Sequence, residues 1–284
     1  MKEVTEYLDS FLNIDCFDGF KLIEDKSIDM ILCDLPYGTT NCDWDIRLPF
    51  PPLWQQYERI IKDNGAILLF SVQPFTTDLV DSNRKKFRYE IIWKKTLPTN
   101  FLNKSFQPMR MHENICVFYK KRPTYNPQMR EVRRNDVGRV RTNGGKAEQY
   151  HEFRKEDYAY VETGMRYPTD VLEFEIDIPD DFEDVVEFSN WNGVLFGKTV
   201  NASKHPTPKP IPLLEYLIKT YTNPGDLILD NCAGSCSTGI AAHNTRRHYI
   251  CMEKDKEIFE RGNKRLKDHI SQITLFDCGM DYTD

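Results

Sequence analysis

Residues 28–38 read I-D-M-I-L-C-D-L-P-Y-G, an apolar run that leads into an acid, a proline and an aromatic residue, with a glycine at the end. Short apolar runs of this kind are typical of strands that are covered on both faces of a sheet. Because Pro36 cannot continue a hydrogen-bonded ladder, the strand is predicted to end at about Asp34. Asp34, the Leu35 carbonyl and Tyr37 are therefore predicted to lie at the carboxyl edge of a sheet, where open α/β sheets bind their ligands.

The chemistry of this turn suits a planar ring with an exocyclic amine, such as adenine or cytosine. The Asp34 carboxylate and the Leu35 carbonyl are hydrogen-bond acceptors, and Tyr37 supplies a flat aromatic face. The same residue types also occur in ordinary turns, because Asp and Pro both favour turns. A structural turn is therefore the alternative for this stretch taken alone.

A second unit that could bind a ligand lies at residues 226–255. A short apolar strand at 227–230 ends in Asp230 and opens into the small-residue loop N-C-A-G-S-C-S-T-G, which leads into a helix. A further strand at 249–252 is followed by Glu253. In such units the loop N–H groups can approach a cofactor, and the second acid can accept from ribose hydroxyls. Because the loop lacks the G-x-G-x-x-G spacing, it favours a nucleoside over a dinucleotide, with an ordinary strand–helix turn as the alternative.

Four motifs of the chain resemble those of the S-adenosylmethionine-dependent amino-methyltransferases that act on DNA. The D-L-P-Y sequence at 34–37 is similar to the catalytic D-P-P-Y motif, and residues 230–239 resemble the D-P-F-x-G-S-G-T-T-G cofactor loop. The H-P-T-P-K-P sequence at 205–210 is similar to the H-P-T-Q-K-P segment that precedes that loop, and residues 15–20 match a further cofactor-side segment. The order of catalytic motif, recognition region and cofactor motif resembles that of the β group.

The resemblance implies transfer of a methyl group from S-adenosylmethionine to the exocyclic N6 of adenine in DNA, after the base is flipped out of the duplex. Cytosine N4 stays open as the target, although Asp rather than Ser at position 34 favours adenine. The implied catalytic residues are Asp34, Leu35, Pro36 and Tyr37. The implied cofactor-binding residues are Asp15, Cys16, Thr207, Lys209, Asp230, Ala233, Gly234, Ser235 and Glu253. For Lys209, a surface charge beside a helix is the alternative.

The chain departs from the family pattern at four positions. Leu35 replaces the first Pro of the catalytic motif, although its carbonyl is still available. Asn231 and Cys232 stand where Pro and Phe are usual, which predicts a weaker contact with the adenine of the cofactor. Cys236 replaces a Gly and predicts a backbone conformation that a Cβ atom permits. A DNA-binding protein without catalysis is therefore an alternative function, as is methylation of RNA or of a protein amide.

Charge is distributed unevenly along the 284 residues, whose formal net charge is −6. Residues 84–146 contain 17 Lys and Arg against 4 Asp and Glu, whereas residues 170–187 contain 9 acids and no bases. Such a basic region indicates contact with phosphates, with a solvated surface as the alternative. The candidate DNA-binding residues are Trp44, Arg130, Arg133, Arg134, Arg139 and Arg141.

The composition predicts a cytoplasmic protein of a bacterial or phage-infected cell. No segment approaches the ~20 apolar residues that span a membrane, and the first residues show no signal-peptide pattern. Eight cysteines without regular spacing indicate reduced thiols, and no zinc ligand set is completed around Cys232 and Cys236. We therefore expect double-stranded DNA as the partner, with no metal and no membrane; a homodimer and a restriction endonuclease partner stay open.

The predicted fold is one Rossmann-like α/β core with an inserted target-recognition region. The sheet is predicted to be mostly parallel, with one antiparallel edge strand at 114–119. Helices are predicted at 50–62, 76–82 and 211–221, and further strands at 66–71 and 89–93, with D-N-G at 63–65 as a stop signal. We assign 1–120 to the catalytic half, 121–190 to a basic recognition insertion with an acidic connector, and 191–284 to the S-adenosylmethionine-binding half.

Overall fold

A computed structural model describes residues 4–39, 45–100, 103–131, 140–142, 159–161, 164–174, 185–189, 195–200 and 208–277. The chain divides into two compact units. The first comprises Met1–Asn126 together with Asp170–Asp284, and the second is Pro127–Thr169. The second unit lies inside the predicted insertion at 121–190 and is shorter than it.

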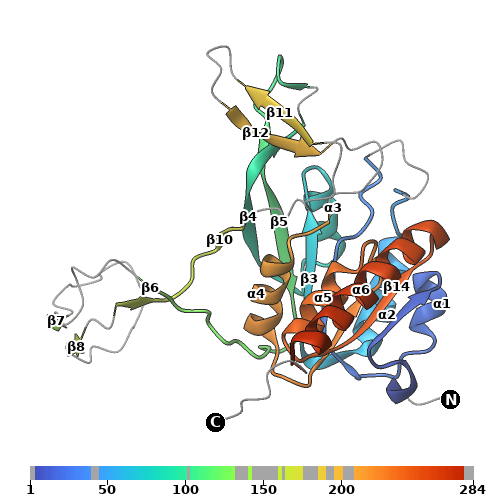
Figure 1. Cartoon of the computed structure of the whole chain (residues 1–284). Helices are drawn as coiled ribbons and strands as arrows, with labels where there is room; N and C mark the ends of the chain where they lie inside the picture. Colours follow the sequence, from blue (N-terminus) through green and yellow to red (C-terminus); the bar gives the residue numbers. More distant parts are fainter. Residues whose placement is uncertain are drawn as a thin grey trace, which may run out of the picture. The chain divides into compact units, whose positions relative to one another are not determined.

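The first unit is built around an eight-stranded sheet in the order β1-β14-β13-β2-β3-β5-β4-β10 (Figure 1). Its strands are β1 (Ser10–Asn13), β2 (Ile28–Cys33), β3 (Ile61–Ser71), β4 (Phe87–Thr99), β5 (Arg110–Phe118), β10 (Val171–Glu173), β13 (Leu227–Asp230) and β14 (His248–Glu253). Neighbouring strands pair in parallel except at β5, which runs antiparallel to both β3 and β4. The predicted mostly parallel α/β sheet is thereby confirmed.

The antiparallel strand lies inside the sheet and not at its edge. β5 contains most of the predicted edge strand at 114–119, but β4 pairs along its outer side and β10 lies beyond β4, with Val171 opposite Ile92. β10 comes from the acidic stretch at 170–187. The edge prediction was wrong because β4, which precedes β5 in the same hairpin, lies outside β5 in the sheet order.

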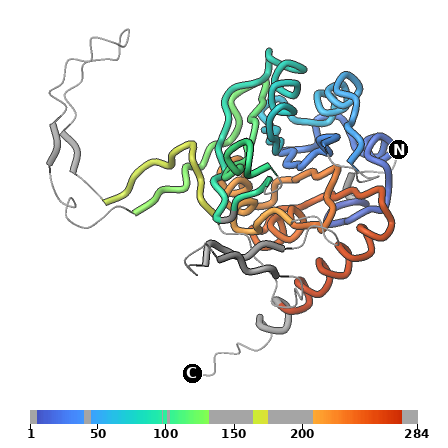
Figure 2. The backbone as a smooth tube through the Cα atoms, turned by 90° about the horizontal axis from the view of Figure 1, so that it is seen from above, coloured from blue at the N-terminus to red at the C-terminus, as the bar shows by residue number. Residues whose placement is uncertain are grey.

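Helices cover both faces of the sheet. On one face lie α4 (Ile211–Tyr221), α5 (Ser237–Asn244) and α6 (Lys256–Asp277), and on the other α1 (Cys16–Phe20), α2 (Phe50–Ile60) and α3 (Phe75–Ser82) (Figure 2). Met30 and Leu32 of β2 pack into the first layer. Ile31 and Cys33, which alternate with them, pack into the second, as the two-residue period of a strand requires. Burial on both faces therefore explains the apolar run.

The start of β3 differs from the prediction. β3 begins at Ile61, directly after α2, and therefore includes residues 63–65, which were predicted to be a stop signal. At these residues the pairing of β3 with β2 is irregular. Gly65 suits this place because a Cβ atom there would lie 2.8 Å from the carbonyl oxygen of Asp29. β4 is likewise longer than the predicted strand at 89–93, because it continues as a hairpin with β5.

The remaining short elements form three two-stranded antiparallel sheets. In the second unit, β6 (Arg130–Glu131) pairs with β9 (Met165–Arg166), and β7 (Val140–Thr142) pairs with β8 (Ala159–Val161). In the first unit, β11 (Val185–Ser189) pairs with β12 (Leu195–Val200), and η1 (Val4–Tyr7) is a short 3-10 helix near the start of the chain. Among the helices of the described residues, none is both long and apolar enough to cross a membrane.

Candidate active site

The strands β13 and β2 are neighbours in the middle of the sheet, with Ile228 opposite Met30. From β2 the chain passes through α2 to β3 on one side, and from β13 it passes through α5 to β14 on the other. α2 and α5 pack on opposite faces, so the two connections diverge at this point. Open α/β sheets bind ligands where their connections diverge in this way. Asp34 and Asp230 stand at these two strand ends.

The predicted catalytic turn follows β2. The Tyr37 hydroxyl donates to Oδ1 of Asp34 at 2.6 Å, and the Tyr37 ring centre lies 4.9 Å from that of Phe75. Burial and the Asp34 carboxylate raise the pKa of Tyr37, so its hydroxyl stays a donor. The Leu35 side chain is buried, Pro36 is partly exposed, and no described group donates to the Leu35 carbonyl oxygen.

Asp45 fixes the loop that follows the catalytic turn. Its two carboxylate oxygens accept from the N–H groups of Gly38, at 2.8 Å, and Thr39, at 2.9 Å. Asp45 is 7% exposed, so these bonds are protected from water. Sequence reasoning missed this residue, although an acid after a turn glycine is a signal for a loop clamp. Trp44, the predicted DNA contact in this loop, lies outside the described residues.

Four charges of alternating sign run from the catalytic carboxylate into the sheet, in the order Asp34, Lys209, Glu113 and Lys95. Nζ of Lys209 donates to Oδ2 of Asp34 at 2.5 Å and lies 3.3 Å from Oε2 of Glu113. Lys95 forms an ion pair with Oε1 of Glu113. The Lys95, Glu113 and Lys209 side chains are only 7%, 11% and 14% exposed. The four groups therefore form one ionic chain that is largely dehydrated except at Asp34, whose side chain is 38% exposed.

Mutual pairing keeps these groups charged. Burial acts to lower the pKa of Lys209, but the carboxylates of Asp34 and Glu113 raise it above its ordinary value. Burial acts to raise the pKa of Glu113, but Lys209 and Lys95 lower it. Lys209 therefore stays protonated between the two carboxylates, and removal of one partner would leave a buried charge unpaired.

Sequence reasoning did not assign Lys95 or Glu113 to the site. The two residues come from β4 and β5, whose register places Trp93 opposite Glu113. A lysine and a glutamate on the two strands of one hairpin are a signal that could have indicated the pair. Their approach to Lys209, which precedes α4, depends on the folded chain and has no local signal.

The predicted cofactor residues follow the carboxyl ends of three neighbouring strands, β1, β14 and β13. Asp15 follows β1 and caps α1, because its Oδ1 accepts from the Phe17 N–H at 2.9 Å. Glu253 ends β14, and its Oε2 accepts from the Gly234 N–H at 3.1 Å. Cys16 begins α1 and is buried. These side chains therefore share one edge of the sheet with Asp34.

The loop after β13 is held from two sides and leaves open space at its glycine. The Ala233 N–H donates to the carbonyl of Met252, and Nη1 of Arg265 in α6 donates to the carbonyl of Ser235 at 3.1 Å. Gly234 has a φ of 51°, and a Cβ atom there would meet nothing within 4 Å. A ligand can therefore approach this loop closely.

Asp230 is a buried carboxyl group, only 4% exposed. Its Oδ1 accepts from the N–H of Cys232 at 3.1 Å, and the Thr238 side chain is a further partner. Burial raises the pKa of Asp230 to about 6, and the Asp34 carboxylate adds to the effect. None of the described groups that set this pKa is a cation. The site would therefore attract a positively charged group of a ligand.

The residues that depart from the family pattern have structural partners. Oδ1 of Asn231 accepts from the buried hydroxyl of Tyr57 at 2.6 Å, and its Nδ2 lies 3.4 Å from the sulfur of Cys232. Cys236 has φ 60° and ψ 31°, so the prediction of a backbone conformation suited to a Cβ atom was wrong. This left-handed conformation costs on the order of 1 kcal/mol for a residue other than glycine. The buried thiols of Cys236 and Cys251 are free and share a hydrogen bond.

The other predicted residues belong to the second unit or lie outside the described residues. Arg130 begins β6 and Arg141 lies in β7, both in the second unit. Thr207, Arg133, Arg134 and Arg139 lie outside the described residues. Within the described part of the chain, no three His, Cys, Asp or Glu side chains are grouped to hold a metal ion, and six cysteines are free.

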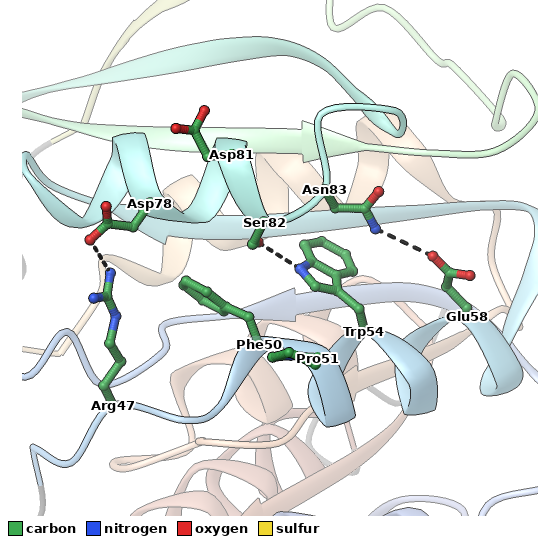
Figure 3. A pocket seen from close by; sticks show the side chains of 9 residues that line it. All are labelled: Arg47, Phe50, Pro51, Trp54, Glu58, Asp78, Asp81, Ser82 and Asn83. Carbon is green, nitrogen blue, oxygen red and sulfur yellow. Dashed lines mark hydrogen bonds and ion pairs between the residues drawn. The ribbon is translucent and has the colours of Figure 1, made fainter.

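A surface pocket of about 770 Å³ lies between α2 and α3, beside the catalytic turn (Figure 3). It is lined by Arg47, Phe50, Pro51, Trp54, Glu58, Asp78, Asp81, Ser82 and Asn83. Arg47 points to Asp78, with 2.7 Å between Nη2 and Oδ2, and lies over the Phe75 ring that contacts Tyr37. The three acids that line the pocket outnumber its one cation, so the pocket does not suit a phosphate group. We interpret its residues as a support for the Phe75 ring, which contacts Tyr37.

The sheet order and the acids at its central strand ends define a Rossmann-like α/β enzyme fold. Residues 28–264 match the model of the N6_N4_Mtase family, described as DNA methylase. Since this match covers most of the chain, the protein belongs to that family of DNA amino-methyltransferases.

Individual relatives agree with the family match over nearly the whole chain. The type II methyltransferase M1.MboII of Moraxella bovis is 27% identical over 267 residues, which cover 88% of this chain and 93% of the relative. The solved M1.HpyAVI–SAM complex covers 90% of this chain and 98% of its own, with 21% identity and a TM-score of 0.54. The cytosine-N4-specific PvuII DNA methyltransferase covers 93% of this chain and 92% of its own, with 13% identity and a TM-score of 0.59. At these identities the two structures support the fold.

Proposed function

We propose that the protein is a site-specific methyltransferase that transfers a methyl group from S-adenosylmethionine to N6 of adenine in double-stranded DNA. The observation that carries this proposal is the carboxylate of Asp34 at the centre of the sheet edge. Its Oδ2 accepts from a nitrogen donor, Lys209, and therefore suits an N–H group. Membership of the DNA methylase family supports DNA as the substrate.

The residues beside the Asp34 turn fit S-adenosylmethionine. Asp230 is a buried acid with a raised pKa and would hold the amine of the methionine end. The loop at Gly234 has room for close approach, Glu253 would accept from the ribose hydroxyls, and Asp15 would face the adenine. The bound cofactor supplies an electrophilic methyl group on a sulfonium. The likeness to M1.HpyAVI, solved as a SAM complex, supports this cofactor.

Asp34 and the Leu35 carbonyl would act on the target amine. The lone pair of adenine N6 is delocalised into the ring, so N6 is a weak nucleophile. Acceptance of both N–H bonds by these two oxygens favours a tetrahedral nitrogen with an available lone pair. That pair forms the new N–C bond while the electrons of the broken S–C bond stay on sulfur. The extra proton of the methylated amine passes to Asp34 and then to solvent.

Positioning supplies much of the proposed rate. Aligned reacting groups can lower a barrier by ~7–11 kcal/mol. The target base must leave the duplex before N6 can reach Asp34, and the Tyr37 ring would stack on it and repay part of the unstacking cost. Tyr37 is suited to this role because its hydroxyl is fixed on Asp34 and its ring packs on Phe75.

Adenine is proposed over cytosine because position 34 is Asp and not Ser. Cytosine N4 is the second candidate, since its amine has the same chemistry and the PvuII enzyme, of the same fold, is cytosine-N4-specific. Contact with DNA is assigned to Trp44 and to the basic region at 84–146, including Arg130, Arg133, Arg134, Arg139 and Arg141. The free thiols suit the reducing cytoplasm of a bacterial or phage-infected cell.

The test uses purified protein, tritiated S-adenosylmethionine and mixed genomic DNA, with RNA and total protein as parallel substrates. The proposal expects label in duplex DNA and in the N6-methyladenosine fraction after digestion to nucleosides. Label in N4-methylcytidine would support the second candidate. Label in RNA or protein alone would contradict both, and DNA binding without label would favour a scaffold that no longer catalyses.

A further inference from the structure

Both oxygens of the Asp34 carboxylate are occupied by donors of the chain itself. The Tyr37 hydroxyl donates to Oδ1, and the Lys209 ammonium donates to Oδ2. In the proposed reaction, the target amine must donate an N–H to the same carboxylate. Lys209 is itself a nitrogen donor and is bound where the target amine is expected to bind. It therefore competes with the substrate for Oδ2.

The charge of Lys209 conflicts with the proposed chemistry as long as it stays on Asp34. Methyl transfer moves positive charge from a sulfonium onto the amine nitrogen, and a fixed ammonium beside that nitrogen would oppose the transfer. Loss of a proton does not solve the conflict, because Asp34 and Glu113 favour the charged form of Lys209. The side chain therefore has to move.

Glu113 offers Lys209 a second position. Oε1 of Glu113 is paired with Lys95, whereas its Oε2 is buried and makes no hydrogen bond within the described residues. Nζ of Lys209 is already 3.3 Å from this oxygen, so a small change in side-chain torsions would complete the bond. A buried acceptor without a hydrogen bond is unfavourable, which gives Lys209 a reason to move there.

We propose that Lys209 is a displaceable gate on Asp34. Its ammonium occupies Oδ2 until the amine of the flipped base enters, and then shifts to Oε2 of Glu113. Lys209 keeps all its protons throughout, and the proton released by the methylated amine still leaves through Asp34. A base without an N–H donor at this position cannot replace the bond that Lys209 gives up. The inference rests on the proposed function and makes Lys209 a positioning residue of the catalytic side.

The test compares the wild type with Lys209→Met, which keeps the length of the side chain and leaves Glu113 paired with Lys95. Without the competing donor, KM for DNA should fall several-fold. Because the wild-type ammonium has already left Asp34 when methyl transfer occurs, kcat should stay within a few-fold of the wild type. The Kd for S-adenosylmethionine should stay within about twofold of the wild type.

Two further variants make the comparison specific. Lys209→Arg keeps a cation beside Asp34 and should keep KM for DNA near that of the wild type. Lys62→Met removes the partly exposed ion pair with Asp29, at 2.7 Å, and should change neither KM nor kcat.

The outcomes separate the gate from the proposed function. A rise in KM for DNA in Lys209→Met would overturn the gate and make Lys209 a substrate-binding residue. A wild type that transfers no methyl group would overturn the proposed function and the gate together. If Lys209→Met does not fold, a crystal structure of the wild type with methylatable duplex DNA and S-adenosylhomocysteine decides. If the gate proposal is correct, Nζ of Lys209 lies closer to Glu113 than to Asp34 in that crystal structure. A hydrogen bond that Lys209 still donates to Asp34 would overturn the proposal.

Discussion

The carboxylate of Asp34 and the ammonium of Lys209 share a hydrogen bond at the carboxyl edge of the sheet, although 175 residues separate them in the chain. The bond joins the turn after β2 to the segment before α4. The two parts of the first unit, which precede and follow the second unit in the chain, therefore meet at this carboxylate. If the methylated amine carried its positive charge about 4 Å from the Lys209 ammonium, the two charges would repel by about 4 kcal/mol at an effective dielectric constant of 20.

Asp34→Asn should abolish methyl transfer and leave cofactor affinity nearly intact. The amide keeps the shape of the side chain, but it is a weaker acceptor and cannot take the proton of the methylated amine. We expect at least a roughly 10³-fold loss of kcat in a filter assay for labelled DNA, with the Kd for S-adenosylmethionine unchanged in calorimetry. A large loss of cofactor binding would show that Asp34 serves the cofactor instead.

Cofactor affinity should depend on the protonation of Asp230. Its pKa is raised by burial to about 6, from an ordinary value of 3.8. The carboxylate attracts the amine of S-adenosylmethionine and the neutral acid does not, so the Kd should rise below about pH 6, approaching tenfold per pH unit. Calorimetry between about pH 5 and pH 7.5 measures this dependence. A Kd that is constant over this range would contradict the assignment of Asp230 to the amine.

The same raised pKa predicts the effect of Asp230→Asn on stability without ligand. Because Asp230 binds its proton more tightly in the folded protein, the stability that it contributes is present below about pH 3.8 and is lost as the pH rises through about 6. Asp230→Asn does not undergo this loss of stability. The Tm of the variant minus that of the wild type should therefore increase between about pH 4 and pH 7. A difference in Tm that does not vary with pH would show that Asp230 is not the titrating group.

Tyr57→Phe should weaken both the fold and the cofactor loop. The change removes the 2.6 Å bond to Asn231 and leaves a buried amide oxygen without its donor, at a cost of about 1–3 kcal/mol. Because Asn231 begins the loop after β13, we also expect a several-fold rise in the Kd for S-adenosylmethionine. Tyr89→Phe is the matched control, since it removes the 2.8 Å bond to the Tyr221 hydroxyl, outside the site. Equal effects of both variants on the Kd would refute a role for Asn231 in the loop.

Binding to duplex DNA should weaken steeply with salt. The basic region at 84–146 is expected to neutralise phosphates and release their counterions. For about six such contacts, affinity would fall by roughly 10³-fold between about 50 and 200 mM salt, and Arg130→Gln should lower the slope by about one contact. Fluorescence anisotropy with a labelled duplex gives the slope. A flat dependence would remove the basis for assigning DNA contact to this region.

The acids of the site could be predicted because each one follows a strand with a strong local pattern. Asp34 and Asp230 end short apolar runs, and the carboxyl ends of parallel strands lie on one edge of a sheet. The helix at 211–221 was predicted at its observed bounds, since Pro and a clear apolar face mark it. Local rules therefore sufficed for the core elements that carry these acids.

The ionic chain behind Asp34 could not be predicted, because it depends on contacts between distant segments. Glu113 and Lys95 meet through the register of the β4–β5 hairpin, and Glu113 reaches Lys209 only when α4 packs on the sheet. The place of β5 inside the sheet likewise depends on the sheet order, in which β5 lies between β3 and β4 although β4 precedes it in the chain. The left-handed backbone at Cys236 is also a tertiary effect, since no local pattern favours it at a cysteine.

The central claim is that the site at Asp34 methylates N6 of adenine in DNA. The most direct measurement is nucleoside mass spectrometry of duplex DNA after incubation with S-adenosylmethionine and either the wild type or Asp34→Asn. The account predicts N6-methyladenosine with the wild type and none with the variant. Methylated product formed equally by both proteins, or N4-methylcytidine as the sole product of the wild type, would contradict it.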